Sequence, residues 1–156
     1  MSTGLNTLLD YTTIKYSPDS NQPVWVAIYN GQADGNDIAY DAAVDSVGNI
    51  YVTGRTDSGP PSGHDYATVK YSTDSNKPVW VAAYSGQDYS DDTGWDIEID
   101  DNDNIYVTGD SFASETSADY VTIKYGSEAN EPLWIAHYTT VVEIGIRYLP
   151  GPGNGY

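Results

Sequence analysis

Apolar and polar residues alternate along short stretches of this chain, and no stretch shows the spacing of an amphipathic helix. The alternation is clear in AYDAAVD at 39–45 and in GWDIEID at 94–100. Each is followed by a turn and then by IYVTG, at 50–54 and at 105–109, whose β-branched and aromatic residues suit a half-buried strand. The pattern therefore predicts an all-β chain built from hairpins.

The pattern recurs at a fixed period. The stretch DYTTIKY at 10–16 returns as DYATVKY at 65–71 and as DYVTIKY at 119–125, so that successive copies begin 55 and 54 residues apart. One tryptophan in each copy keeps the same intervals; these are Trp25, Trp80 and Trp134. Self-similarity with a period of roughly 50 residues indicates a propeller or a related array.

Each repeat unit reads as four strands. The alternating strand and the IYVTG strand are followed by a polar loop, RTDSGPPSGH at 55–64 in the first complete copy. The DYATVKY strand comes next, and the turn STDSNKP at 72–78 leads to a fourth strand, VWVAAY at 79–84. Four antiparallel strands joined by short connections form a propeller blade. The predicted fold is all-β, with antiparallel four-stranded blades, two complete and one half.

The chain divides at the repeat boundaries. A propeller needs about four or more blades, so this chain does not close a ring alone. The alternatives are a fragment of a longer protein, a protomer of an oligomeric ring and an open curved sheet. The unpaired strand edge of the half blade predicts self-association. The expected segments are an N-terminal extension at 1–9, repeats over 10–138 with a half blade at 10–37 and blades at 38–92 and 93–138, and a divergent tail at 139–156.

The order of these motifs carries a resemblance to a known family. DYATVKY, an SNKP turn, VWVAAY and then DAAVDSVGNIYVTG resemble the SBBP-type (seven-bladed) β-propeller repeat over about residues 10–138. The resemblance implies a propeller fold and little about activity. It favours an extracellular or cell-surface location, because similar repeats occur in large bacterial and archaeal surface and secreted proteins. The opening residues, MSTGLNTLLDY, contain no basic and apolar signal segment, which favours a fragment.

Charge and composition exclude several partners. The chain has 23 acidic and 6 basic residues and a net charge of −17, which repels nucleic acid phosphates and anionic lipids. No apolar run approaches the roughly 18 residues of a membrane span. Cysteine is absent, so disulfides and thiolate chemistry are excluded. We therefore expect no nucleic acid partner and no membrane insertion.

Half of the basic residues occupy one position of the repeat. A catalytic lysine is normally unique and lies in one asymmetric pocket, whereas a lysine repeated in every unit serves the fold. We expect each methylene stem to lie on the neighbouring sheet and each ammonium to bind a carboxylate or a carbonyl. The lysines are Lys15, Lys70 and Lys124, and the candidate carboxylates are Asp41, Asp96, Asp45 and Asp100.

The repeated tryptophans, Trp25, Trp80 and Trp134, are interpreted in the same way, as packing between blades. The alternative is carbohydrate recognition by repeated aromatic residues. The 15 tyrosines, against one phenylalanine, agree with either interpretation, since tyrosine combines a flat ring with a hydroxyl group.

Residues that break the repeat supply the other candidates. His64, His137 and Arg55 have no counterparts in the other copies, and we interpret them as surface variation. The acidic stretch DIEIDDNDN at 96–104 makes calcium the one candidate cofactor, although the glycine and distal glutamate of an EF-hand loop are missing. A hairpin turn capped by Asp100 is the alternative.

Three classes of function remain. The favoured one is a non-catalytic module that serves as a binding or structural scaffold for a protein or glycan partner at a cell surface. The second is a fragment of a carbohydrate-active propeller enzyme, which would need a pair of carboxylates that break the repeat. Glu98, at the place of Ala43 in the preceding copy, is the only candidate for such a pair. The third is a self-associating structural tile. No catalytic, cofactor-binding or metal-binding residue is assigned.

Overall fold

The computed structural model describes residues 8–86, 90–113 and 116–139, which form β-strands and no helix. The predicted all-β fold is confirmed. Within these ranges no helix is long and apolar enough to cross a membrane. The strands are β1 (Tyr11–Tyr16), β2 (Pro23–Tyr29), β3 (Ile38–Val44), β4 (Ile50–Gly59), β5 (Gly63–Tyr71), β6 (Pro78–Tyr84), β7 (Asp92–Ile99), β8 (Ile105–Ala113), β9 (Thr116–Tyr125) and β10 (Pro132–Tyr138).

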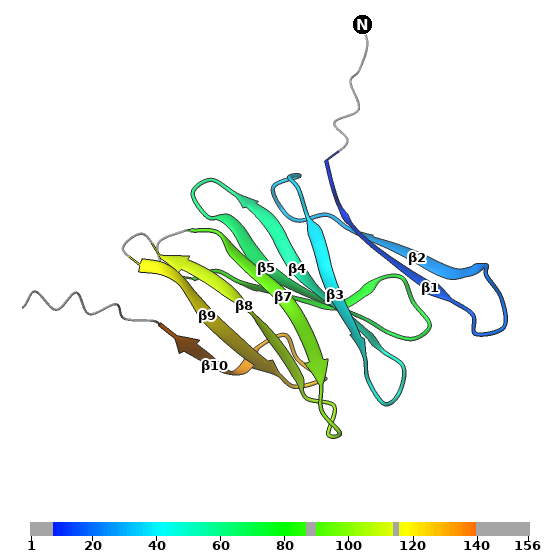
Figure 1. The fold of residues 1–156 in the computed structure, drawn as a ribbon. Coiled ribbons are helices and arrows are strands. Elements are labelled where there is room, and N and C mark those ends of the chain that lie inside the picture. The colour runs from blue at the N-terminus through cyan, green and yellow to red at the C-terminus, as the bar shows by residue number, and fades with distance from the viewer. Residues whose placement is uncertain (1–7, 87–89, 114–115, 140–156) are drawn as a thin grey trace, which may run out of the picture.

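The strands form three antiparallel sheets. β1 and β2 form a two-stranded sheet, the half-blade. β3, β4, β5 and β6 follow one another in a four-stranded sheet, the first blade, and β7, β8, β9 and β10 form the second blade in the same order. Figure 1 shows the three sheets side by side in chain order. Two complete blades and a half-blade are therefore present, as predicted, and the sheets of the described ranges do not close a ring.

The hairpin between β4 and β5 is longer than the sequence predicts. The stretch 55–64 was expected to be a polar loop, but β4 continues to Gly59 and β5 begins at Gly63. Asp57 and His64 lie opposite each other in the extended ladder. Both glycines have positive φ, 71° and 68°, which allows the strands to reverse within a few residues. Polar side chains are tolerated there because backbone pairing, and not apolar burial, holds the extension.

The core lies between the sheets. Tyr66 of β5 is buried on the face that packs against the second blade, where Ile123 belongs to the same cluster. Val69 and Tyr71 of β5 are buried on the opposite face, against Tyr11 of the half-blade. The first blade is therefore covered on both faces, because alternate residues of its strands point in opposite directions.

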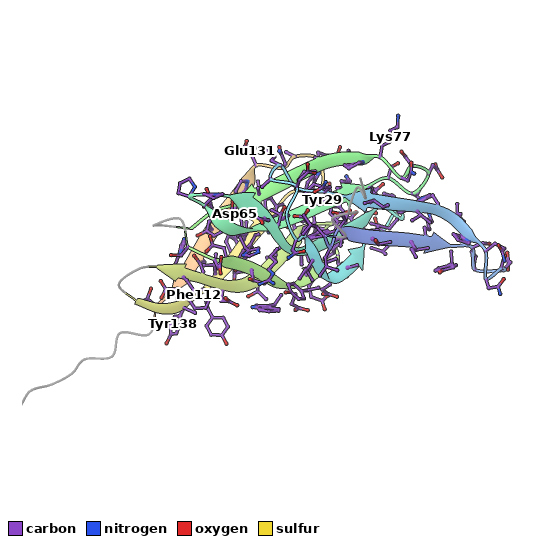
Figure 2. All side chains as sticks on the ribbon, turned by 90° about the horizontal axis from the view of Figure 1, so that it is seen from above. Tyr29, Asp65, Lys77, Phe112, Glu131 and Tyr138 are labelled. Carbon is purple, nitrogen blue, oxygen red and sulfur yellow. The ribbon has the colours of Figure 1, made fainter. Side chains whose placement is uncertain are left out.

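The half-blade and the second blade form the two ends of the described structure, each with a neighbouring sheet on one face. The view from above in Figure 2 places Phe112 and Tyr138 of the second blade at the end opposite to β1 and β2. The predicted tail lies outside the described residues, apart from residue 139, and so does most of the predicted N-terminal extension.

Candidate functional site

The repeated lysine and tryptophan bind one backbone carbonyl of the neighbouring sheet. At the first junction, Lys15 Nζ donates a hydrogen bond to the carbonyl oxygen of Thr73 at 2.6 Å. Trp25 Nε1 donates to the same oxygen at 3.3 Å. Thr73 lies in the turn between β5 and β6, so these bonds connect the half-blade to the first blade.

The second junction repeats this arrangement. Lys70 Nζ and Trp80 Nε1 donate to the carbonyl oxygen of Ser127 at 2.6 and 3.3 Å, in the turn between β9 and β10. Only 6% of the Lys70 side chain is exposed, and its ammonium lies 5.4 Å from the centre of the Tyr51 ring. We call this lysine–tryptophan pair on a shared carbonyl the carbonyl clamp.

Of the two kinds of partner expected for the lysines, the clamp contains the carbonyl. None of the four candidate carboxylates binds them; Lys15 and Lys70 bind carbonyls, and Glu128 lies 4.0 Å from Lys70. Asp45 and Asp100 bind residues of their own turns instead, because the next blade brings its turn, and not its first strand, to the ammonium. Asp41 accepts a hydrogen bond from the backbone of Ile97 at 3.0 Å.

The acidic turn after β7 is an Asx turn. Asp100 Oδ1 accepts hydrogen bonds from the backbone nitrogens of Asn102 and Asn104, both at 2.9 Å. The backbone and then the side chain of Asn104 lower the pKa of Asp100 to about 2. Asp45 binds Asn49 in the same way in the first blade. In the part of the chain that the structure describes, no three acidic or histidine side chains are placed to hold a metal ion, and calcium stays a prediction.

Both histidines contact the neighbouring blade. The backbone nitrogen and the ring Nδ1 of His64 lie 3.0 Å from Asp91 Oδ1, and these hydrogen bonds lower the pKa of Asp91. His64 thus connects the long β4–β5 hairpin to the segment before β7 through hydrogen bonds. His137 Nε2 of the second blade lies 3.5 Å from the hydroxyl group of Tyr84 of the first.

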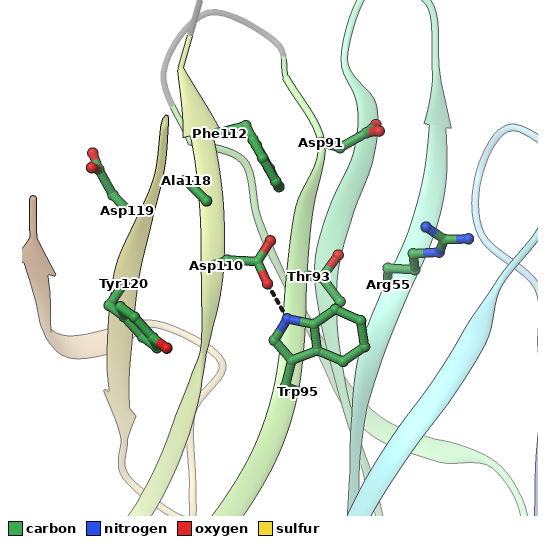
Figure 3. Close-up of a pocket in the computed structure, with 9 residues that line it drawn as sticks. All are labelled: Arg55, Asp91, Thr93, Trp95, Asp110, Phe112, Ala118, Asp119 and Tyr120. Atoms are coloured by element: carbon green, nitrogen blue, oxygen red, sulfur yellow. Dashed lines mark hydrogen bonds between the residues drawn. The ribbon is translucent and has the colours of Figure 1, made fainter. Parts of the chain in front are cut away.

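An open cleft of about 500 Å³ extends from the first blade across the second. Three aromatic side chains line it from successive strands: Trp95 of β7, Phe112 of β8 and Tyr120 of β9 (Figure 3). Their exposed fractions are 49%, 44% and 69%. Arg55 reaches the cleft from β4, and Asp110 lies between the rings of Trp95 and Phe112 in this view.

The polar groups of the cleft are held in place by neighbours. Trp95 Nε1 donates a hydrogen bond to the carboxylate of Asp110, and the Tyr40 ring packs against Trp95 with 4.5 Å between ring centres. The positive charge of Arg55 adds to the hydrogen bonds from His64 in lowering the pKa of Asp91. Arg55 Nε is buried and has no hydrogen-bond partner among the described residues. The cleft therefore combines flat apolar rings with anionic acceptors and one cationic donor.

Comparison with family models matches residues 24–60 to the SBBP beta-propeller repeat. This stretch is therefore similar to an SBBP beta-propeller repeat. The matched stretch runs from β2 of the half-blade through β4 of the first blade, so it spans the first junction. The comparison does not test the seven-bladed form. A comparison with curated proteins finds no match.

The cleft contains residues that depart from the internal repeat of the chain. Trp95 stands where the first blade has Tyr40, and Phe112 is the only phenylalanine of the chain. Arg55 stands where the second blade has Asp110. The sequence shows that Arg55 differs from its counterpart in the second blade. It does not show that Arg55 and Trp95 line the same cleft. The sequence signal that these residues share is that each differs from its counterpart in the other blade.

The clamp leads to a prediction about stability. Lys70→Met keeps the aliphatic stem and removes the charged donor, so the free energy of unfolding should fall by about 1–2 kcal/mol. Chemical denaturation at low protein concentration measures this change. The matched control is Lys124→Met, because Lys124 packs on the Tyr106 ring and has no turn carbonyl to bind among the described residues. Equal losses in the two variants would contradict the clamp.

Proposed function

We propose that this chain is a non-catalytic β-propeller module that binds a neutral oligosaccharide in the cleft that extends from the first blade across the second. The observation that carries the proposal is the exposure of three aromatic rings beside carboxylates in one cleft. Ligand sites are concave and mainly apolar, with a few polar groups that fix the orientation of the ligand. The module would thus serve as a scaffold for a glycan partner, and its cell-surface location stays a prediction.

The chemistry of the cleft suits a sugar. The ring faces of Trp95 and Tyr120 can pack against the apolar face of a pyranose ring. Asp110 and Asp91 can accept hydrogen bonds from hydroxyl groups, and Arg55 can donate them. A neutral ligand is favoured because the net charge of −17 repels acidic glycans.

Departures from the repeat separate this site from ordinary packing between blades. Tyr120 alone would not mark a site, because its counterpart Tyr66 is buried under the next blade. Trp95 replaces Tyr40 and Phe112 replaces Asp57 of the first blade, and the cleft also contains the Arg55 substitution. A purely architectural surface would repeat in each blade, so three departures in one cleft support ligand binding.

The ionisation of Asp91 does not suit the proton-donating acid of a glycosidase. A glycosidase needs a carboxylic acid whose pKa is raised, so that it can donate a proton. The pKa of Asp91 is instead lowered, first by the hydrogen bonds from His64. Glu98, the carboxylate that the enzyme alternative required, lies opposite Tyr106 in the β7–β8 ladder and does not line the cleft.

Calorimetric titration with neutral tetrasaccharides tests the proposal. The panel consists of β1,4-linked and β1,3-linked glucan, α1,4-linked glucan, mannan and chitin fragments. At least one is expected to bind, and Trp95→Ala should weaken its affinity at least tenfold, because the largest ring surface of the cleft is lost.

Trp134→Ala is the matched control. Trp134 is exposed to a similar extent, 43%, but lies on β10 outside the cleft, so its loss should leave the affinity for the sugar unchanged. The proposal would be wrong if no member of the panel bound the wild-type chain, or if both tryptophan variants lost the same affinity.

A further inference from the structure

Each junction between sheets also contains a hydrogen bond in the reverse direction, in which the sheet that supplies the clamped carbonyl is the donor. The side-chain amide of Asn76, in the first blade, donates a hydrogen bond to the carbonyl oxygen of Val26 at 2.9 Å. Asn130 of the second blade donates to the carbonyl of Val81 at 3.0 Å. A junction therefore has a lysine side, which supplies lysine, tryptophan and a strand carbonyl. It also has an asparagine side, which supplies the clamped turn carbonyl and an asparagine amide.

An aromatic contact joins the same two sides. Trp25 lies 5.7 Å from Tyr71 between ring centres, and Trp80 lies 5.9 Å from Tyr125. Both tyrosines are the last residues of strands on the asparagine side, and both are buried. Each contact occurs at both junctions with nearly the same geometry, so together they define one interface that the chain uses twice.

The second blade presents a complete lysine side that no described residue of a further sheet covers. Lys124 and Trp134 stand at the positions of the clamp residues, and Ile135 supplies the carbonyl that corresponds to those of Val26 and Val81. The Trp134 side chain is 43% exposed, whereas its counterpart Trp80 is packed against the core between the blades.

The half-blade presents a complete asparagine side that is likewise not covered by another sheet within the described ranges. Pro18 supplies the turn carbonyl, Asn21 the amide and Tyr16 the aromatic ring at the positions found in both blades. Tyr16 is 52% exposed and Ile14 is 42% exposed, although the corresponding first-blade residues, Tyr71 and Val69, are fully buried. The two ends of the structure thus carry the two halves of the interface that is buried twice inside it.

We infer that the second blade of one copy binds the half-blade of a second copy, head to tail. Lys124 and Trp134 of one chain clamp the Pro18 carbonyl of the next, and Asn21 of the next chain donates to the Ile135 carbonyl. The occupant is a second copy because this chain itself carries both matching sides. A contact between two different surfaces propagates into open chains unless the rotation closes a ring.

The half-blade has two strands fewer than a complete blade, which determines how strongly it binds the second copy and whether the cleft stays open. Tyr66 is covered by Gly94 and Gly109 of β7 and β8, and the half-blade has no strands at those positions. A docked half-blade therefore leaves Tyr120 and the sugar cleft open. The contact is smaller than an internal junction, and the net charge of −17 on each copy opposes it. Association should be weak and should strengthen with added salt.

Sedimentation equilibrium over a hundredfold range of concentration, at low and high salt, tests the inference. The wild-type chain should form dimers and higher species. Trp134→Ala and Tyr16→Ala should each remain monomeric, because the first disrupts the lysine side of the interface and the second disrupts the asparagine side. An equimolar mixture of the two variants should form a dimer and nothing larger, because each variant keeps one intact side and the two sides match.

Two further variants keep the test interpretable. Lys124→Met should also weaken association, which repeats the result at a position where the aliphatic stem is preserved. Trp95→Ala should associate like the wild type, so failure of sugar binding and failure of assembly are separate results. The inference is overturned if the wild-type chain stays monomeric throughout, or if Tyr16→Ala alone associates, since the contact would then join two second blades.

Discussion

Above pH 10 the free energy of unfolding is expected to fall by about 5 kcal/mol for each pH unit, because four buried tyrosines ionise only after unfolding. Burial is the first cause that raises the pKa of each above the ordinary value of 10.0. Each contributes about 1.4 kcal/mol per pH unit. The four are 0–2% exposed and are Tyr11, Tyr51, Tyr66 and Tyr125, and Tyr71, which is 0% exposed and whose pKa is also raised first by burial, adds to the effect.

The sign of this effect follows from proton binding. Above pH 10 the unfolded chain has released the phenolic protons that the folded chain still holds, so rising pH favours unfolding. Below that pH both states keep these protons and the contribution is constant. A small domain has a total stability of about 5–15 kcal/mol, so the fold should be lost within a few pH units of the onset.

Denaturant titrations between neutral pH and pH 11, with tyrosine absorbance recorded in parallel, measure this effect. Tyr66→Phe is the matched variant, because the Tyr66 hydroxyl has no hydrogen-bond partner among the described residues. The Tyr66→Phe variant should keep the stability of the wild type at neutral pH. Above pH 10 its free energy of unfolding should fall less steeply with pH, by the contribution of one tyrosine. Ionisation of all tyrosines near pH 10 without loss of β-sheet signal would contradict the buried positions of these rings.

Gly109→Ala is expected to destabilise the chain by about 3 kcal/mol or more. A Cβ atom at this position would lie 1.9 Å from the Thr93 carbonyl oxygen and 2.6 Å from the Tyr66 hydroxyl oxygen. Gly54 meets Ile38 and Tyr11 in the same way at the other junction. The glycine of IYVTG therefore leaves room for the tyrosine of the preceding sheet.

Thermal and chemical unfolding of Gly109→Ala against Gly126→Ala measures the effect of the missing space. At Gly126 the nearest atom to an added Cβ is Leu133 Cδ1 at 3.9 Å, so alanine should change the stability by less than about 0.5 kcal/mol. An unchanged unfolding midpoint in Gly109→Ala would show that β7 and Tyr66 do not approach Gly109 as closely as the structure indicates.

The sequence predicts the blades well because their determinants are local. Alternation, turn residues and the repeated motifs define strands, order and period without reference to distant contacts. The β4–β5 hairpin was predicted less well. Its extension is polar in sequence, and the strands continue because backbone pairing and the positive-φ glycines Gly59 and Gly63 permit it.

The candidate site depends on contacts between blades, which the sequence does not reveal. Repetition of Lys70 predicts a role in the fold, and its partner in the structure is a backbone carbonyl, which every residue possesses and no pattern marks. The cleft has the same difficulty. Arg55 and Trp95 are 40 positions apart in the chain, and only the packing of β4 beside β7 brings them to one surface.

The most direct test of the proposed function is an NMR titration that follows the indole N–H signals of the four tryptophans with a neutral tetrasaccharide. The signal of Trp95 is expected to shift with the sugar, because its indole lies in the cleft and binds Asp110. The signals of Trp25 and Trp80, both held in carbonyl clamps, should stay in place. If the Trp95 signal stayed unchanged at saturating concentrations of every sugar in the panel, the proposed oligosaccharide site would be wrong.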